Sequence, residues 1–317
     1  MTISIHELAR LTNLSIATVS RVFNQRDGVR PKTRERVLAA AAKHGYVPQQ
    51  SARSRLVGVL VESREGLDLY AYGSMLLEAI SREARKRGFQ LRLILPEDLE
   101  TGAAPLGLHQ IICMAYSQEQ INQLSGTTAK VVCINTRHAE FHSVCSDEEQ
   151  GIALAIDHLF VHGHSRIGLL LASGDNECAQ RRHKAFADTM KIKGHHADDL
   201  MQLVSGECAM QAIAKLLRQG VTGIIACGEG LGLAASYALN MLGKEVPADI
   251  SLIGHDYRGV SRYLWPAQTT MAQDFEAMAE ACFKLIQDSP DKPCQLTIPY
   301  QFIKRDSVAR LASNERT

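Results

Sequence analysis

The sequence predicts an all-α helix-turn-helix headpiece followed by an α/β core of two doubly wound subdomains. The first fifty residues hold three short helix patterns, the rest alternates strand-like with helix-like runs, and that alternation occurs twice. At 317 residues and 45 % hydrophobic content, the chain can form more than one domain and bury a sizeable core. We place the headpiece at 1–48, a shortened hinge at 49–56 and the core at 57–317.

Charge is divided between these parts. Residues 1–56 carry ten Lys and Arg against three acidic residues, a net charge of +7, and the remainder carries 25 against 31, a net charge of −6. A small basic module on a mildly acidic body is typical of a module that meets a polyanion. An ordinary solvated basic surface is the alternative.

Composition excludes some classes of protein. No run of roughly 18 apolar residues is present, so we expect no membrane partner. The first residues lack the basic-then-apolar layout of a signal peptide. The eight cysteines are scattered without a Cys-x-x-Cys pair, which favours free thiols and a cytoplasmic location.

The first two helix patterns are predicted to form a helix-turn-helix. Ser4 and Glu7 have the spacing of a capping box. Thr12-Asn13-Leu14 interrupts the pattern, and Ser15 can cap a second helix that runs through Phe23. Because the start of the second helix of such a unit enters the major groove, the pattern predicts DNA binding.

Helical spacing assigns faces to the second and third helices. In the second, the inward residues are Val19, Val22 and Phe23, and the outward ones are Ile16, Ala17, Ser20 and Arg21. In the third, which follows Pro31 and stops at Gly45, the inward residues are Val37, Leu38 and Ala41.

The stretch from Ser4 to Asn24 strongly resembles the opening signature of the lactose-repressor (LacI/GalR) family, and Thr33–Val37 and Tyr46-Val47-Pro48 continue the match. The resemblance implies a sequence-specific transcriptional regulator, expected to be a repressor, that binds operator DNA. It implies control by a small-molecule effector, a sugar or sugar derivative, with no enzyme activity, no catalytic residues and no cofactor.

The resemblance also implies which residues touch DNA. Ile16, Ala17 and Arg21 would face bases, with Arg21 the candidate for a bidentate contact to a guanine. Further contacts, mostly to phosphates, would come from Ser4, Thr18, Ser20, Asn24, Thr33, Tyr46 and Arg53. Ordinary helix surface is the alternative for Thr18, Ser20 and Arg21.

The hinge departs from the family pattern, which usually reads Tyr-x-Pro-Asn-x-x-Ala-Arg-x-Leu and then a linker. Here Gln49 replaces the Asn, Arg55 takes the leucine position, and Leu56 already begins an apolar strand. The family's leucine wedges into the minor groove and bends the duplex. We hypothesise that this protein lacks the wedge or must unravel strand residues to supply it.

The core sequence predicts two successive series of strands and helices. The first has strands Leu56–Val61, Gln90–Leu95, Gln110–Met114 and Lys130–Ile134, with helices Met75–Arg87 and Gln118–Leu124. The second has strands Arg166–Leu171, Thr222–Ala226 and Ser251–Gly254, with helices Glu149–His162, Arg181–Lys191 and Leu231–Leu242. Alternation predicts parallel sheets, with a ligand cleft beyond the carboxyl ends of the strands.

The core also resembles the family's sensor core, which is periplasmic-binding-protein-like. Asp147–Gly151, Gly163–Ile167 and Val246–Asp256 are among the best-matching stretches. By resemblance the chain crosses between subdomains near 140–147, 271–274 and 300. The first subdomain is then about 57–140 and 275–300, and the second about 147–271 plus a C-terminal strand. We expect a homodimer, although the short segment 96–109 replaces a family helix and leaves the dimer geometry open.

Effector-binding residues follow from family position. Arg182 and Asp256 are the candidates that keep the family's residue type, and Gln273 and Asp147 are secondary candidates. Tyr72 and Ser74 would line the effector site from the first subdomain. In the second subdomain, Gly228-Glu229 stands where the family has Asn-Asp. Asp147 and Asp256 have an alternative role as helix caps or subdomain contacts.

Other readings are weaker. His158, His162 and His164 have spacing that suggests a metal cluster, but no further ligands are apparent, so we predict no metal.

One rival function is a sugar-binding sensor with a degenerate headpiece that acts by protein contacts, which the short hinge favours. Another is a doubly wound enzyme with a basic appendage.

Overall fold

The computed structural model describes residues 4–23, 29–44, 46, 55–62, 72–100, 108–172, 177–197, 199–204, 209–228, 230–255, 259–288, 290 and 292–311. The chain divides into two units, residues 1–55 and 56–317, which are described separately. Four predicted site residues lie outside the described residues: Asn24, Arg53, Glu229 and Asp256.

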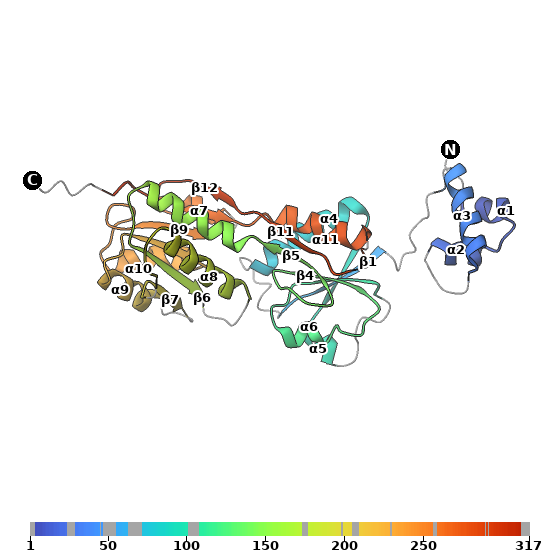
Figure 1. Cartoon of the computed structure of the whole chain (residues 1–317), viewed down its shortest axis with the longest axis horizontal. Helices are drawn as coiled ribbons and strands as arrows, with labels where there is room; N and C mark the ends of the chain where they lie inside the picture. The colour runs from blue at the N-terminus through green and yellow to red at the C-terminus, as the bar shows by residue number, and fades with distance from the viewer. Residues whose placement is uncertain are drawn as a thin grey trace, which may run out of the picture. The chain divides into compact units, whose positions relative to one another are not determined.

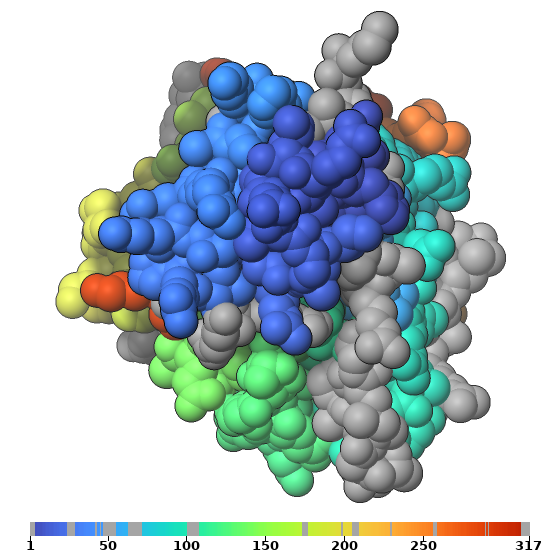
Figure 2. Space-filling model, turned by 90° about the vertical axis from the view of Figure 1, so that its right-hand side faces the viewer, coloured from blue at the N-terminus to red at the C-terminus, as the bar shows by residue number. Residues whose placement is uncertain are grey.

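The headpiece is a globule of three helices, coloured blue in Figure 2: α1 (Ile5–Leu11), α2 (Ile16–Phe23) and α3 (Pro31–Lys43). Its small core contains Leu8, Val19, Val22 and Val37. The prediction that Leu38 faces inward is wrong, because its side chain is 47 % exposed. Val37 and Ala41 are one turn apart and share the buried face of α3, whereas Leu38 is rotated by about 100° from Val37.

The first subdomain is a parallel sheet with helices on both faces (Figure 1). Its strands, in the order β11-β5-β4-β3-β1-β2, are Gln295–Ile298, His142–Ser146, Lys130–Ile134, Gln110–Cys113, Leu56–Leu60 and Gln90–Ile94. One face is covered by α4 (Tyr72–Arg87) and α11 (Phe275–Asp288). The other is covered by α5 (Pro96–Glu100) and α6 (Gln118–Asn122).

The second subdomain repeats this plan. Its strands, in the order β12-β10-β9-β8-β6-β7, are Gln301–Ile303, Thr269–Ala272, Ser251–His255, Gly223–Cys227, Ile167–Ala172 and Met201–Val204, and only β12 pairs in antiparallel fashion. One face is covered by α7 (Glu148–Val161) and α8 (Glu177–Ile192), and the other by α9 (Ala209–Arg218) and α10 (Leu231–Met241).

The chain passes between the two sheets three times, after β5, after β10 and between β11 and β12. These passages confirm the predicted fold class of two doubly wound α/β subdomains. The sequence interpretation missed β5, which pairs with β4 and β11, so the first sheet continues to Ser146 rather than ending near 140. The strand is short and carries His142, Ser143 and Ser146, which dilute its apolar pattern.

None of the described helices combines enough length with enough apolar character to cross a membrane.

Candidate DNA-binding surface and effector site

The helix-turn-helix is fixed by local hydrogen bonds. The Ser4 Oγ accepts from the Glu7 amide at 3.2 Å, and the Glu7 carboxylate accepts from the Ser4 amide at 2.8 Å, which completes the predicted capping box. In the turn, Asn13 adopts a φ of +48°, a conformation that Asn tolerates better than most residues. The Ser15 Oγ then accepts from the Thr18 amide at 3.1 Å and sets where α2 begins.

One side of α2 faces solvent. Ile16 is 41 % exposed, Ala17 and Arg21 are exposed, and Val19 and Val22 are buried on the opposite side. Ile16, Ala17 and Arg21 are the residues for which the sequence predicts base contacts. The helix brings all three to one solvent-facing side.

The described residues with predicted phosphate contacts come from all three helices and from the segment after α3. Thr18, Ser20 and Thr33 are half-buried, and the Ser4 side chain is engaged in the cap. The Tyr46 ring packs on Phe23 with ring centroids 5.2 Å apart. Burial raises the pKa of Tyr46, so its hydroxyl stays protonated at neutral pH and can donate a hydrogen bond.

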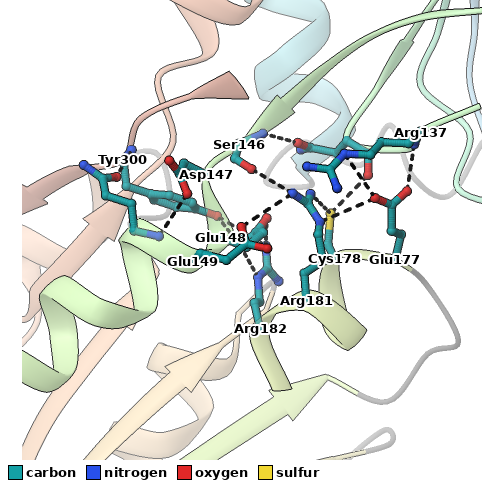
Figure 3. Close-up of polar contacts among 12 residues, drawn as sticks. Arg137, Ser146, Asp147, Glu148, Glu149, Glu177, Cys178, Arg181, Arg182 and Tyr300 are labelled. Carbon is teal, nitrogen blue, oxygen red and sulfur yellow. Dashed lines mark hydrogen bonds and ion pairs between the residues drawn. The ribbon is translucent and has the colours of Figure 1, made fainter. Parts of the chain in front are cut away.

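A buried ion pair lies where α8 meets the start of α7 (Figure 3). The Arg182 Nε and Nη2 donate to the two carboxylate oxygens of Glu148 at 2.6 and 3.0 Å. The Tyr300 hydroxyl donates to the same carboxylate at 3.0 Å. The Glu148 side chain is only 1 % exposed and that of Arg182 13 %. Arg182, predicted to hold the effector, therefore already has a carboxylate partner.

The surroundings fix the protonation states of this group. Burial alone would lower the pKa of Arg182, but the adjacent Glu148 raises it well above its usual value, so the guanidinium stays charged. Burial and Glu148 raise the pKa of Tyr300, which stays a neutral donor. Burial and then Arg182 lower the pKa of His255 far below its usual value, so His255 stays neutral against the Tyr300 ring, 5.6 Å away.

A second group of contacts joins the two subdomains (Figure 3). The Arg137 backbone amide, after β4, donates to Glu177 at the start of α8 at 2.7 Å, and the Arg137 Nε lies 3.6 Å from the same carboxylate. The Cys178 thiol donates to the Asn135 carbonyl at 3.2 Å. Arg181, 8 % exposed, lies 3.6 Å from Glu177, and within the described residues its Nε has no hydrogen-bond partner.

The first subdomain contributes aromatic rings at the same end of its sheet. The Tyr72 hydroxyl accepts from the Asn135 amide, and the Tyr72 ring lies 5.5 Å from Phe275 and 6.0 Å from Tyr116. Ser74 is half-buried on the first turn of α4. Gln273, on the second passage between subdomains, donates to the Ser146 hydroxyl at 2.8 Å.

Two of the remaining predicted residues have local structural roles. Asp147 is the N-cap of α7, and its Oδ1 accepts from the Gln150 amide at 2.9 Å. This cap is the alternative that the sequence left open. Gly228 adopts a φ of +145°, and a Cβ there would lie 2.8 Å from the Ala172 Cβ. The backbone therefore requires glycine where the family has Asn.

Several residues of this region were not predicted: Asn135, Glu148, Glu177, Arg181 and Tyr300. Two of them carried a usable signal. Glu148 directly follows Asp147 in a stretch that resembles the family, and Tyr300 lies at the predicted third crossing. The others depend on contacts between distant segments, which the sequence does not show.

The histidine cluster of His158, His162 and His164 makes structural contacts. The His164 ring bonds to Thr222, Ser251 and the Ala309 carbonyl at 2.9–3.0 Å. The His158 ring packs against His162 and Phe302. Across the described ranges, no three His, Cys, Asp or Glu side chains are placed to hold a metal ion.

Comparison with known proteins matches both units. Residues 4–49 match the bacterial regulatory proteins of the lacI family, and residues 156–308 match a periplasmic binding protein-like domain. The lactose operon repressor of Escherichia coli (strain K12) is 27 % identical over 99 % of this chain and 92 % of its own length. The transcriptional repressor PurR of Klebsiella pneumoniae is also 27 % identical, over 96 % of this chain and 97 % of its own length.

Solved structures share the fold. A complex of the transcriptional regulator CelR with cellobiose has a TM-score of 0.71 at 22 % identity, over 96 % of this chain and 99 % of its own. A Lac repressor dimer bound to operator and the anti-inducer ONPF has a TM-score of 0.69 at 24 % identity, over 98 % and 100 %. With the helix-turn-helix, the two-subdomain core and both sequence matches in place, this chain carries a DNA-binding domain of the lacI family of bacterial regulatory proteins, joined to a periplasmic-binding-protein-like domain.

Proposed function

We propose that the protein is a cytoplasmic transcriptional repressor, not an enzyme, that binds operator DNA through α2 and releases it in response to an uncharged carbohydrate. The observation that carries the DNA-binding part is the solvent-facing side of α2, where Ile16, Ala17 and Arg21 lie on a headpiece of high positive charge. The seven described cysteines are free, in keeping with a reducing compartment.

The carbohydrate class is supported by relatives and by the chemistry of the site. A family regulator from Enterococcus faecium, 25 % identical over 81 % of this chain and with a TM-score of 0.67, was solved with bound ribose. In this chain Tyr72, Tyr116 and Phe275 offer aromatic surface against which a sugar ring can pack. Tyr300 and Gln273 add hydroxyl and amide groups.

Charge balance favours an uncharged ligand. Arg182 is neutralised by Glu148, and Arg137 and Arg181 are opposed by Glu177 and Glu149. A phosphate or carboxylate near Arg182 would have to lie close to Glu148, which repels it. A neutral hydroxyl donates and accepts hydrogen bonds without adding charge, so it meets this condition.

Contacts between the subdomains supply a route for control. Glu177 and Cys178 hold the start of α8 against Arg137 and Asn135 of the first subdomain. A ligand that prefers one spacing of the subdomains shifts the protein toward that state by its differential affinity. The rival function, a sensor with a degenerate headpiece, is not favoured, because the capping box and the headpiece core are intact.

The protein forms a homodimer in this proposal, and α10 offers a face for it. Leu233, Tyr237 and Met241 recur every four residues on α10 and are 47–64 % exposed. Gln268 donates to the Gly232 carbonyl at 3.0 Å and brings its segment against the same helix. That segment carries Tyr263 and Trp265, which are 74 % and 98 % exposed, and in this proposal they extend the apolar face of α10.

Genome-wide occupancy on fragmented native DNA tests the DNA-binding function. Wild-type protein is expected to give a few strong peaks with a two-fold symmetric motif, and Arg21→Ala is expected to lose them. Diffuse binding that is equal for both proteins would overturn the proposal and restore the sensor interpretation.

Thermal unfolding tests the effector class. Neutral mono- and disaccharides, including cellobiose and ribose, are compared with glucose 6-phosphate and glucuronate, each at matched ionic strength. We expect stabilisation by a neutral sugar and none by the anionic ones. Stabilisation by the anionic sugars alone would contradict an uncharged ligand.

A further inference from the structure

The amino-terminal edge of the first sheet carries a group of exposed cations. Because all six strands of this sheet are parallel, their first residues lie along one edge, in the order Gln295, His142, Lys130, Gln110, Leu56 and Gln90. The C-terminal ends of α4 and α11 reach the same edge, where the Arg87 guanidinium bonds to the Gln287 side chain.

We call the cations of this edge the basic edge: Arg85, Lys86, Arg87, Lys130 and Lys292. Four of them are exposed, and Arg87 is half-buried. Among the described residues, the carboxylates nearby are Glu83, which is buried and paired with Lys86 and Arg87, and the exposed Glu140 and Asp288. In the sequence, Asp291 also precedes Lys292, so five cations stand against four carboxylates. The edge is thus net positive on a core whose overall charge is negative.

The positive charge of Lys130 acts on the neighbouring strand β5. The pKa of His142 is lowered by its burial and by the positive charge of Lys130 beside it. Across the adjacent strand, the Lys130 amide donates to the carbonyl of the exposed His109 at 2.9 Å. A polyanion laid along this edge would neutralise its exposed positive charges.

The place where the headpiece connection joins the core indicates which polyanion could reach the basic edge. Leu56, the first residue of β1, lies on the edge, and the connection to the headpiece joins the core there. Tyr46 packs on Phe23 and belongs to the headpiece, so nine residues, 47–55, make the whole connection. Fully extended, they span at most about 30 Å. A headpiece bound to an operator therefore tethers this core edge within about 30 Å of Tyr46, so DNA is a polyanion within its reach.

We propose that the basic edge of the core binds the phosphate backbone of the DNA that the headpiece holds. This inference rests on the proposed DNA-binding function. The contact would add affinity and salt dependence without reading sequence, because phosphates carry no base identity. It would also compensate for the shortened hinge, by giving the core its own attachment to the duplex.

The test is the salt dependence of DNA affinity for the full-length chain. The variant combines Arg85→Gln, Lys130→Gln and Lys292→Gln. The control combines Lys191→Gln, Lys215→Gln and Arg218→Gln, which removes the same charge from exposed sites of the second subdomain. Both are measured on the selected operator and on a random-sequence duplex of equal length. Thermal unfolding verifies that both variants fold.

We expect the edge variant to bind both duplexes more weakly and to lower the slope of log K against log salt by about two to three. The control variant keeps the wild-type slope. Equal slopes for the wild type and both variants would overturn the basic edge while leaving the operator function standing. Absence of any operator preference in the wild type would overturn the proposed function instead, and the random duplex still decides whether the edge touches phosphate.

Discussion

The guanidinium of Arg182 is bound by the carboxylate of Glu148 through two hydrogen bonds, at 2.6 and 3.0 Å, in a setting from which water is almost excluded. The pair joins α7 to α8, and Tyr300 ties it to the third passage between the subdomains. One ion pair therefore links three separate segments of the chain. It determines both the charge that an effector meets and the stability of this end of the second subdomain.

Removal of the Glu148 charge should destabilise the protein. In Glu148→Gln the buried Arg182 loses its counter-charge, and breaking a buried pair costs about 3–5 kcal/mol in the free energy of unfolding. Urea denaturation measures this loss. Glu149→Gln is the matched control, because its side chain is 57 % exposed on the same helical turn. Equal small losses in both variants would show that the pair does not stabilise the fold.

Arg21 should control sequence selection rather than charge attraction. Arg21→Lys keeps the positive charge but loses the planar pair of donors that matches a guanine. We expect operator affinity to fall by about 1–3 kcal/mol, with little change on random DNA. Fluorescence anisotropy on both duplexes measures the difference. A parallel fall on both would mean that Arg21 contacts phosphate only.

Gly228 should tolerate no side chain. Gly228→Ala places a Cβ 2.8 Å from that of Ala172 at a φ of +145°, so we expect a loss of about 1–3 kcal/mol in unfolding free energy. Gly126→Ala is the control, since its φ is +79° with no atom within 4 Å of the added Cβ. It isolates backbone strain from the clash. If Ala172→Gly does not relieve part of the loss in Gly228→Ala, the clash is not its cause.

Regular elements could be predicted from the sequence because their patterns are local. β1, β4 and α10 lie within one residue of the predicted ranges, since apolar alternation and Gly stops mark them. The side-chain pairings at the candidate effector site could not be predicted in this way. Arg182 was predicted by resemblance, but its partner Glu148 is 34 positions away, and the Arg137–Glu177 contact spans 40. Such pairings depend on how the sheets place the ends of their strands, which local spacing does not encode.

The half-buried His158 should lower the free energy of unfolding in mild acid. Its burial, and then the charges of His162 and Lys304, lower its pKa from 6.5 to about 4. The unfolded chain therefore takes up a proton near pH 6.5 that the folded protein refuses until about pH 4, so stability is lost as pH falls between these values. His158→Gln should flatten this part of the profile in urea denaturation. His183→Gln, at an exposed site of α8, should leave it unchanged, and identical profiles for all three proteins would contradict the assignment.

The apolar face on α10 should be the face that dimerises. Tyr237→Glu places a charge between Leu233 and Met241 on the exposed side of α10, so we expect dimer affinity to fall by at least about tenfold. Trp265 is the only tryptophan and is 98 % exposed in the single chain, so its emission should shift to the red when dilution separates the dimer. Sedimentation velocity gives an independent measure. Ile192→Glu, at an 86 % exposed apolar site on α8, is the control. A dimer that resists Tyr237→Glu but dissociates with Ile192→Glu would move the interface to α8.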